Sequence, residues 1–475
     1  MASRTLLAGM TVVMTLWLIA CQSPARHVDY RSAALTGLVD RAATENRTAA
    51  PHAKRLGDHD LAADAPSLPV LSTDSTLADY VVYALLENPQ LEAQFNRWKA
   101  ALEEGIIEGT LPDPQFTYRY YIVRMGAGPD MEQRQTMELS QVFPWFGKLK
   151  LRSKRAEDEA AAQKQLFEAE RLRVIYEVKD AYYEYYYLAQ SIHNTRESRR
   201  LTEHMEGVAR ARYRADAVGH ADVIRAQVEL GRLDDRVRTQ EDLRAPAMAR
   251  LNAVLNRPAD AELPWPGEIE PVPTNLDDSD ILALAEEHNP QLKAMIHTID
   301  REQRGIALAR KEYFPDIMVG GEWMDMTMMP GMSGDSRDGW AVMVGVNVPI
   351  WWHKYAAGVR QASARHHAAQ LERLDEVNAL RTRLARALYE LRDAERKIAL
   401  YRDTLIPRAE ASVGATEAAF RTGTATFLEL LESVRVLLEF ELSHQRALAS
   451  QAQRLAEVEM WVGRNLPRTQ HNEST

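Results

Sequence analysis

The sequence has almost no cysteine: Cys21 is the only one among 475 residues. A single thiol excludes intrachain disulfides and cysteine-based metal sites. Aromatic residues make up only 7% of the chain, and no Lys/Arg-rich run offsets the net charge of -10. The acidic balance argues against nucleic acid as a partner. The sequence is instead rich in alanine, leucine, glutamate and arginine. This composition predicts long helices rather than compact mixed domains.

Long apolar runs are also missing, except at the N-terminus, where residues 1–20 read MASRTLLAGMTVVMTLWLIA. A short region with Arg4 before an apolar stretch is typical of a secretory signal. Cys21 follows directly, and the ending LIAC resembles a bacterial lipobox, which predicts a lipid-modified Cys21; a simple cleavable signal with an incidental cysteine is the alternative. Gln22 at the next position favours the outer membrane. Because later segments lack the ~20 apolar residues of a membrane helix, a spanning chain would need strands closed into a barrel.

The tetrapeptide NPQL occurs twice, at residues 88–91 and 289–292, and further matches follow it in the same order. Its asparagine can cap a helix and its proline suits the first helical turn, so each copy is expected to restart or bend the helix that leads toward a hairpin. The matched segments are LPDPQF and FPDIMV from 111 and 314, VFPWFGKLKLRSKRA and NVPIWWHKYAAGVRQA from 142 and 347, and YRADAVGHADVIRAQVEL and FRTGTATFLELLESVRVL from 213 and 420. Their separation drifts only from 201 to 207 residues, which predicts an internal duplication. The expected organisation is signal peptide 1–20, lipidated tether 21–72, first repeat 73–257, connecting segment 258–275, second repeat 276–467 and C-terminal tail 468–475.

Each repeat is expected to contain a β-hairpin between helices. Apolar residues alternate with others over 340–348 and over 116–122, the period of strands. The apolar positions form one face, whereas Arg119, Glu138 and Glu322 fall on the other, a pattern typical of a transmembrane barrel. Four strands cannot close a barrel, so either several chains share one or the strands belong to a soluble sheet. Residues 148–212 and 355–419 are each expected to form one long helix.

The lipobox, the duplication, the hairpins and the paired long helices together resemble the TolC-type outer-membrane efflux proteins. The resemblance covers about Leu71 to Pro467. It implies an α+β membrane protein: a homotrimeric channel with a 12-stranded β-barrel, four strands per protomer, continued by a long α-helical barrel across the periplasm. It also implies a lipid-anchored protein of the bacterial outer membrane whose partners are a periplasmic adaptor and an inner-membrane pump of the RND type.

The same resemblance places the periplasmic entrance at the turns joining the long helices. Candidates for adaptor docking are Tyr213, Asp216, Phe420 and Gly423, and candidates for an acidic gate are Glu429, Glu432 and Asp222. Glycine suits the second turn because it accepts positive φ, whereas Asp216 stands where the family has glycine in the first. Acidic residues are also common on solvated helix faces, which is the alternative explanation for the gate candidates.

Methionine is concentrated around the second hairpin, in MVGGEWMDMTMMPGMSGD. The alternating pattern puts Met318, Met324, Met326 and Met328 on the side of Glu322. Thioethers prefer soft ions such as Cu(I), so the sequence favours export of heavy metals, copper or silver; methionine that merely fills space is the alternative. Multidrug efflux, type I protein secretion and a non-channel coiled-coil scaffold are the other functions considered. We find no catalytic constellation and expect neither an enzyme nor a cofactor.

Overall fold

The computed structural model describes residues 68–128, 131–214, 219–267, 277–328 and 337–467. The chain forms two compact units, Met1–Val70 and Leu71–Thr475, and the second is described here by itself. The expected signal peptide and Cys21 therefore lie outside the described residues. Lipid modification of Cys21 stays a prediction.

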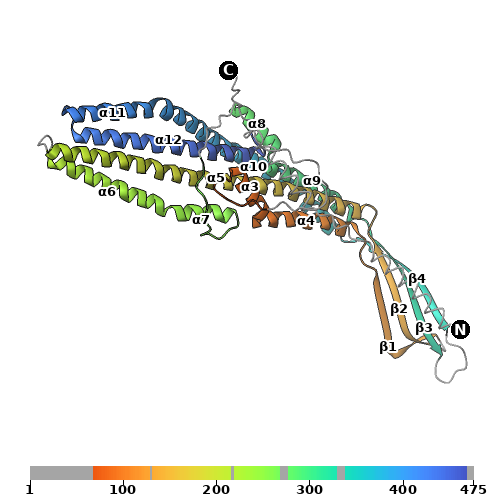
Figure 1. Cartoon of the computed structure of the whole chain (residues 1–475). Helices are drawn as coiled ribbons and strands as arrows, with labels where there is room; N and C mark the ends of the chain where they lie inside the picture. Colours follow the sequence, from red (N-terminus) through yellow and green to blue (C-terminus); the bar gives the residue numbers. More distant parts are fainter. Residues whose placement is uncertain (1–67, 129–130, 215–218, 268–276, 329–336, 468–475) are drawn as a thin grey trace, which may run out of the picture. The chain divides into compact units, whose positions relative to one another are not determined.

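The second unit repeats one order of elements, in which two helices precede a hairpin and long helices follow it (Figure 1). The first set is α3 (Leu77–Glu87), α4 (Pro89–Gly109), β1 (Gln115–Gly128), β2 (Met131–Phe143), α5 (Lys148–Arg214), α6 (His220–Asp242) and α7 (Arg244–Val254). The second set is α8 (Asp278–His288), α9 (Pro290–Lys311), β3 (Ile317–Met328), β4 (Arg337–Val346), α10 (Trp352–Leu400), the π-helix η1 (Tyr401–Leu405), α11 (Ile406–Thr422) and α12 (Phe427–Val462). Within the described ranges, no helix combines the length and apolarity needed to cross a membrane.

The two NPQL copies have the same structural role. Asn88 accepts hydrogen bonds from the N–H groups of Gln90 (3.0 Å) and Leu91 (3.1 Å), and Asn289 accepts one from Leu292 (3.0 Å). Each asparagine thus caps the helix that begins with the following proline, as the sequence predicts. Each copy therefore divides the leading helix in two.

The side-chain amides of both asparagines also reach the end of the returning helix. Asn88 donates to the carbonyl of Val254 (3.1 Å), and Asn289 donates to the carbonyl of Trp461 (2.8 Å). Two residues after each of these carbonyls the backbone turns to positive φ, at Asn256 (55°) and Gly463 (88°). The start and the end of each repeat are therefore joined by one buried asparagine.

The four strands form one antiparallel sheet in the order β1-β2-β3-β4, so β1 and β4 are its edges. The register places Tyr118, Met137, Trp323 and Trp340 in one row across the sheet. This apolar face is largely exposed, with Trp340 at 76%. On the opposite face Arg119 lies 3.1 Å from Glu138 and 3.8 Å from Glu322. The predicted division of the hairpins into an apolar and a charged face is confirmed.

Helix α5 runs unbroken for 67 residues, as expected, and packs against α4, α6, α9 and α12. The prediction of one uninterrupted helix over 355–419 is wrong, because the π-helix η1 separates α10 from α11. Pro407 follows it at the start of α11. Proline cannot donate a backbone hydrogen bond, and its ring clashes with the carbonyl four residues earlier, so the helix changes its hydrogen-bond spacing there.

Candidate functional site

The far ends of the two long helical hairpins meet in one apolar cluster, which we name the tip cluster. It comprises Met205, Ala209, Val223, Ala226, Val413, Phe420, Phe427, Leu430, Leu431 and Val434. These residues come from α5, α6, α11 and α12, which run alongside one another in Figure 1. The cluster buries the helix ends against each other and sets the positions of both turns.

The turn between α11 and α12 is built on Gly423, whose φ of 85° is the left-handed value that the sequence analysis expects of glycine. The N–H of Gly423 donates to the carbonyl of Phe420 (3.1 Å), and the N–H of Thr424 donates to that of Ala419 (2.9 Å). Phe420 itself is only 1% exposed and meets Phe427 edge to face at 5.6 Å. The Phe420 side chain is therefore packed beneath the turn, against Phe427.

Arg212, near the end of α5, ties the two hairpins together at this level. Its guanidinium lies over the Phe420 ring at 4.7 Å and donates a hydrogen bond to the Phe420 carbonyl. Both contacts favour the charged side chain at the end of α11, where unpaired carbonyls accumulate. Sequence reasoning did not find Arg212, because an arginine in a helix with many arginines carries no distinguishing pattern. Only the spatial meeting of α5 with α11 reveals its role.

The three acidic gate candidates have different surroundings. Glu429 closes a capping box at the start of α12, since its carboxylate accepts from the N–H (2.7 Å) and the hydroxyl (3.0 Å) of Thr426. The hydrogen bond from the backbone N–H of Thr426, and then the one from its hydroxyl, lower the pKa of Glu429 below its usual value. Its charge is thus kept, but one of its two oxygens, Oε2, already accepts both hydrogen bonds at the helix end.

Glu432 is exposed, with 64% of its side chain accessible, and forms an ion pair with Arg435 at 3.7 Å. Arg435 also pairs with Glu229, and so links α12 to α6. Asp222, in the first turn of α6, pairs with Arg225 at 3.1 Å. Of the candidate acids, Glu432 thus combines an exposed side chain with the longest contact, whereas Asp222 is 20% exposed and Glu429 is held by Thr426.

Of the docking candidates, Tyr213 is exposed and its ring lies 5.2 Å from that of His220, across the turn between α5 and α6. Asp216 lies outside the described residues. Phe420 and Gly423 belong to the neighbouring turn, and the tip cluster holds the two hairpins side by side. The structure thus brings three of the four docking candidates to the same end of the helical hairpins.

Met318, Met324 and Met326 share the charged face of the sheet but do not converge on one point. The side-chain methyls of Met324 and Met326 both lie over Gly339, whereas that of Met318 lies over Gly345. Met318 and Met324 are six residues apart on one strand, which corresponds to roughly 20 Å. Met328 ends β3, paired with Met131. Among the three predicted methionines whose side chains the structure describes, Met324 and Met326 form the close pair.

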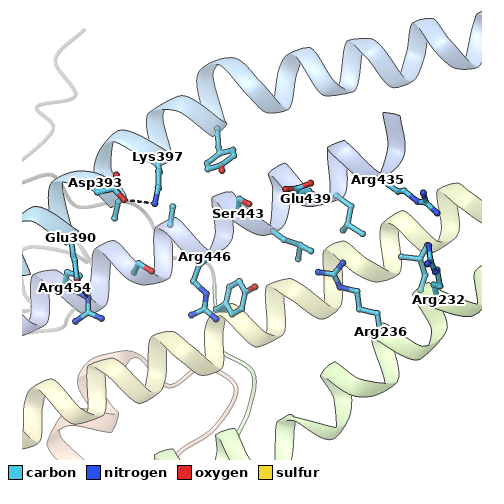
Figure 2. A pocket seen from close by; sticks show the side chains of 18 of the residues that line it. Arg232, Arg236, Glu390, Asp393, Lys397, Arg435, Glu439, Ser443, Arg446 and Arg454 are labelled. Atoms are coloured by element: carbon cyan, nitrogen blue, oxygen red, sulfur yellow. Dashed lines mark ion pairs between the residues drawn. The ribbon is translucent and has the colours of Figure 1, made fainter. Parts of the chain in front are cut away.

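A groove of about 880 Å³ runs along α12 between α10 on one side and α5 and α6 on the other (Figure 2). Its walls carry charges of both signs, most of them paired: Asp393 meets Lys397 at 2.6 Å and Arg454 meets Glu390 at 2.9 Å. Arg446 lies over the Tyr187 ring at 3.6 Å. The groove is thus lined by side chains of both charges and lies between helices. Among the residues that the structure describes, no group of three or more His, Cys, Asp or Glu side chains could hold a metal ion.

The sequence profile of the outer membrane efflux protein family matches residues 81–257 and 281–464. Because these segments make up more than half of the chain, the protein belongs to that family. Membership makes efflux through the outer membrane its class of function and supports a channel rather than an enzyme. The resemblance to TolC-type proteins is confirmed.

Solved structures show the same fold at low sequence identity. A membrane protein from Pseudomonas aeruginosa is 18% identical with a TM-score of 0.70, over 84% of this chain and 99% of that one. The outer membrane protein VceC from Vibrio cholerae is 15% identical with a TM-score of 0.67, over 82% and 96%. CusC, described in connection with transmembrane channel formation, is 14% identical with a TM-score of 0.70, over 88% and 100%. No curated protein matches the chain.

Proposed function

We propose that the protein is the outer-membrane channel of a tripartite efflux system, formed by three copies that share one barrel. The observation that carries the proposal is the open sheet, whose edges β1 and β4 are unpaired within the chain and whose apolar face is exposed. Unpaired edges and exposed apolar surface both call for a partner, and three sheets of four strands joined edge to edge give twelve strands around a pore. The apolar face would then meet lipid, and Arg119, Glu138 and Glu322 would line the lumen.

The long helices would continue this pore through the periplasm to an entrance at the tip cluster. A periplasmic adaptor would dock on the turns around Tyr213 and Gly423, and an RND-type inner-membrane pump would supply the energy. Cys21 would carry the lipid anchor in the outer membrane. Three copies of Glu432 around the narrow end would favour cations over anions.

The channel is tested by conductance across planar lipid bilayers. We expect the purified protein to form cation-selective pores, and Glu432→Gln to lower the cation preference several-fold without closing them, because the acidic ring loses its charge. Glu439→Gln is the matched control, since it removes an exposed charge from the same helix two turns away. Absence of any conductance would reject the channel, whereas equal selectivity in both variants would reject the role of Glu432 alone.

We further propose that the cargo includes soft metal ions, copper or silver. Two thioethers side by side on the lumen face, Met324 and Met326, offer weak ligands that suit transient binding.

The double variant Met324→Leu/Met326→Leu is expected to lower resistance to Cu(I) and Ag(I) several-fold while leaving dye resistance unchanged. Leucine keeps size and apolarity but removes the sulfur. Met137→Leu, on the opposite face of the same sheet, is the control and should have no effect. Growth in graded metal and dye concentrations measures both. Unchanged metal resistance in the double variant would contradict a metal role and favour multidrug efflux or protein secretion.

A non-channel coiled-coil scaffold is the remaining alternative. It would expose no lipid-facing sheet, so it would dissolve without detergent. A trimer that needs detergent and changes its gel mobility on heating excludes it.

A further inference from the structure

The junction between the sheet and the helices is pinned inside each chain by a buried lysine. Lys148, the first residue of α5, is 1% exposed. Its ammonium donates to Asp316 Oδ1 (2.9 Å), to the carbonyl of Phe314 (3.1 Å) and to Glu312 Oε2 (3.4 Å). These acceptors precede β3, whereas the lysine follows β2. The contact therefore joins the end of β2 to the start of its neighbour β3.

Trp145 completes this junction. Its backbone N–H donates to Asp316 Oδ1 (2.9 Å), and its ring stacks on Phe314 at 5.3 Å. Asp316 thus accepts from a lysine and from a backbone N–H at once, a charge-assisted arrangement that fixes both segments.

The duplication supplies a second copy of each half of this junction. Lys354 aligns with Lys148, and the N–H of each lysine donates at 2.9 Å to the carbonyl of the tryptophan three residues earlier, Trp351 or Trp145. Leu111-Pro112-Asp113 aligns with Phe314-Pro315-Asp316. The two turns therefore share this backbone hydrogen bond, although α5 begins at Lys148 and α10 begins two residues before Lys354.

The second lysine and the second aspartate cannot meet within one chain. Lys354 follows β4 and Asp113 precedes β1, and these strands are the opposite edges of the sheet, roughly 14 Å apart at three strand spacings. Both side chains are exposed, and neither forms an ion pair with another described residue. Trp351 and Leu111 are exposed too. The β4 edge thus carries the lysine of a second junction, and the β1 edge carries its aspartate.

We propose that Lys354 of one copy pairs with Asp113 of the next copy, with Trp351 packed on the neighbouring Leu111, so that each subunit boundary repeats the Lys148–Asp316 junction. The occupant of each edge is a second copy of this chain, and the inference rests on the proposed trimer. Two elements differ: Gly109 stands where the intrachain junction has Glu312, so the lysine at the boundary has one carboxylate instead of two, and Leu111 stands where it has Phe314, so the tryptophan meets an aliphatic side chain instead of a ring.

The double variant Asp113→Cys/Lys354→Cys, treated in detergent with a short bismaleimide, tests the pairing. Three links around the ring should convert most of the protein into a covalent trimer on a denaturing gel. Each single variant should remain a monomer on the same gel. Both single variants keep Cys21, so any cross-linking through Cys21 would also appear in them. A short spacer cannot join the two positions within one chain.

Charge exchange provides a second test that needs no cross-linker. Asp113→Lys and Lys354→Asp should each lower the temperature at which the trimer dissociates, by placing like charges at every boundary. The combined variant Asp113→Lys/Lys354→Asp should restore it. The native mass in detergent separates the possible failures: a trimer without cross-links or rescue overturns the pairing alone, whereas a monomeric mass overturns the proposed trimer as well.

Discussion

Gly463→Ala is expected to destabilise the protein by about 2–4 kcal/mol, the sum of two effects. Gly463 ends α12 with φ of 88°, a conformation that costs a residue with a Cβ about 1–2 kcal/mol. A Cβ at this position would also lie 2.6 Å from the carbonyl oxygen of His288 and 3.0 Å from Cδ of Pro290. Both neighbours belong to backbone or ring and cannot rotate away, so the segment around the second NPQL must shift. The thermal midpoint of the helical signal, followed by circular dichroism in detergent, measures the loss.

Gly423→Ala is the matched control because Gly423 has nearly the same φ, 85°, and also follows a helix end. A Cβ there would meet only the end of the Arg212 side chain at 3.2 Å. A flexible side chain can move, so we expect a loss of about 1–2 kcal/mol from backbone strain alone. If both alanine variants lose the same stability, the contact between α12 and His288 is not the cause.

Lys148→Met is expected to cost about 2–4 kcal/mol. Methionine fills a similar volume but leaves Asp316 and Glu312 without their shared cation, and the Phe314 carbonyl without its donor. Removing one partner of a buried charged pair is costly because the remaining charge is poorly solvated. We expect a lower thermal midpoint, with Lys150→Met as the control, since Lys150 is exposed two residues further along α5.

The double variant Lys148→Met/Asp316→Asn should recover part of this loss, because the uncompensated carboxylate is then neutral. Such a cycle isolates the coupling between the two residues. An additive loss in the double variant would contradict a direct Lys148–Asp316 interaction.

Much of the architecture could be predicted from local patterns. The alternation over 116–122 and 340–348 identified the strands and their faces because side chains alternate strictly along a strand. The asparagine and proline of NPQL predicted helix starts because capping depends on neighbouring residues. The helix break before Pro407 was overlooked, although proline in a helical pattern is itself a local signal.

The candidate site was less accessible to prediction. Gly423 could be identified because positive φ is a property of the residue itself. The surroundings of the other residues depend on how the hairpins pack. Phe420 is buried and Arg212 lies over its ring. Glu429 accepts hydrogen bonds at the helix end, whereas Glu432 is exposed with a longer ion pair. Residue type alone did not separate the three acids.

The sequence by itself determined the duplication, the strand faces and the helix caps, because each follows from residues close together along the chain. Only the tertiary structure decided which repeated residues have partners within one chain. Lys148 reaches Asp316 because β2 and β3 are neighbours, whereas Lys354 and Asp113 lie on opposite edges of the same sheet. The physical reason is the open sheet: it places one lysine–aspartate pair on neighbouring central strands, where the two residues meet, and the corresponding pair on its two edges, where they cannot meet within one chain.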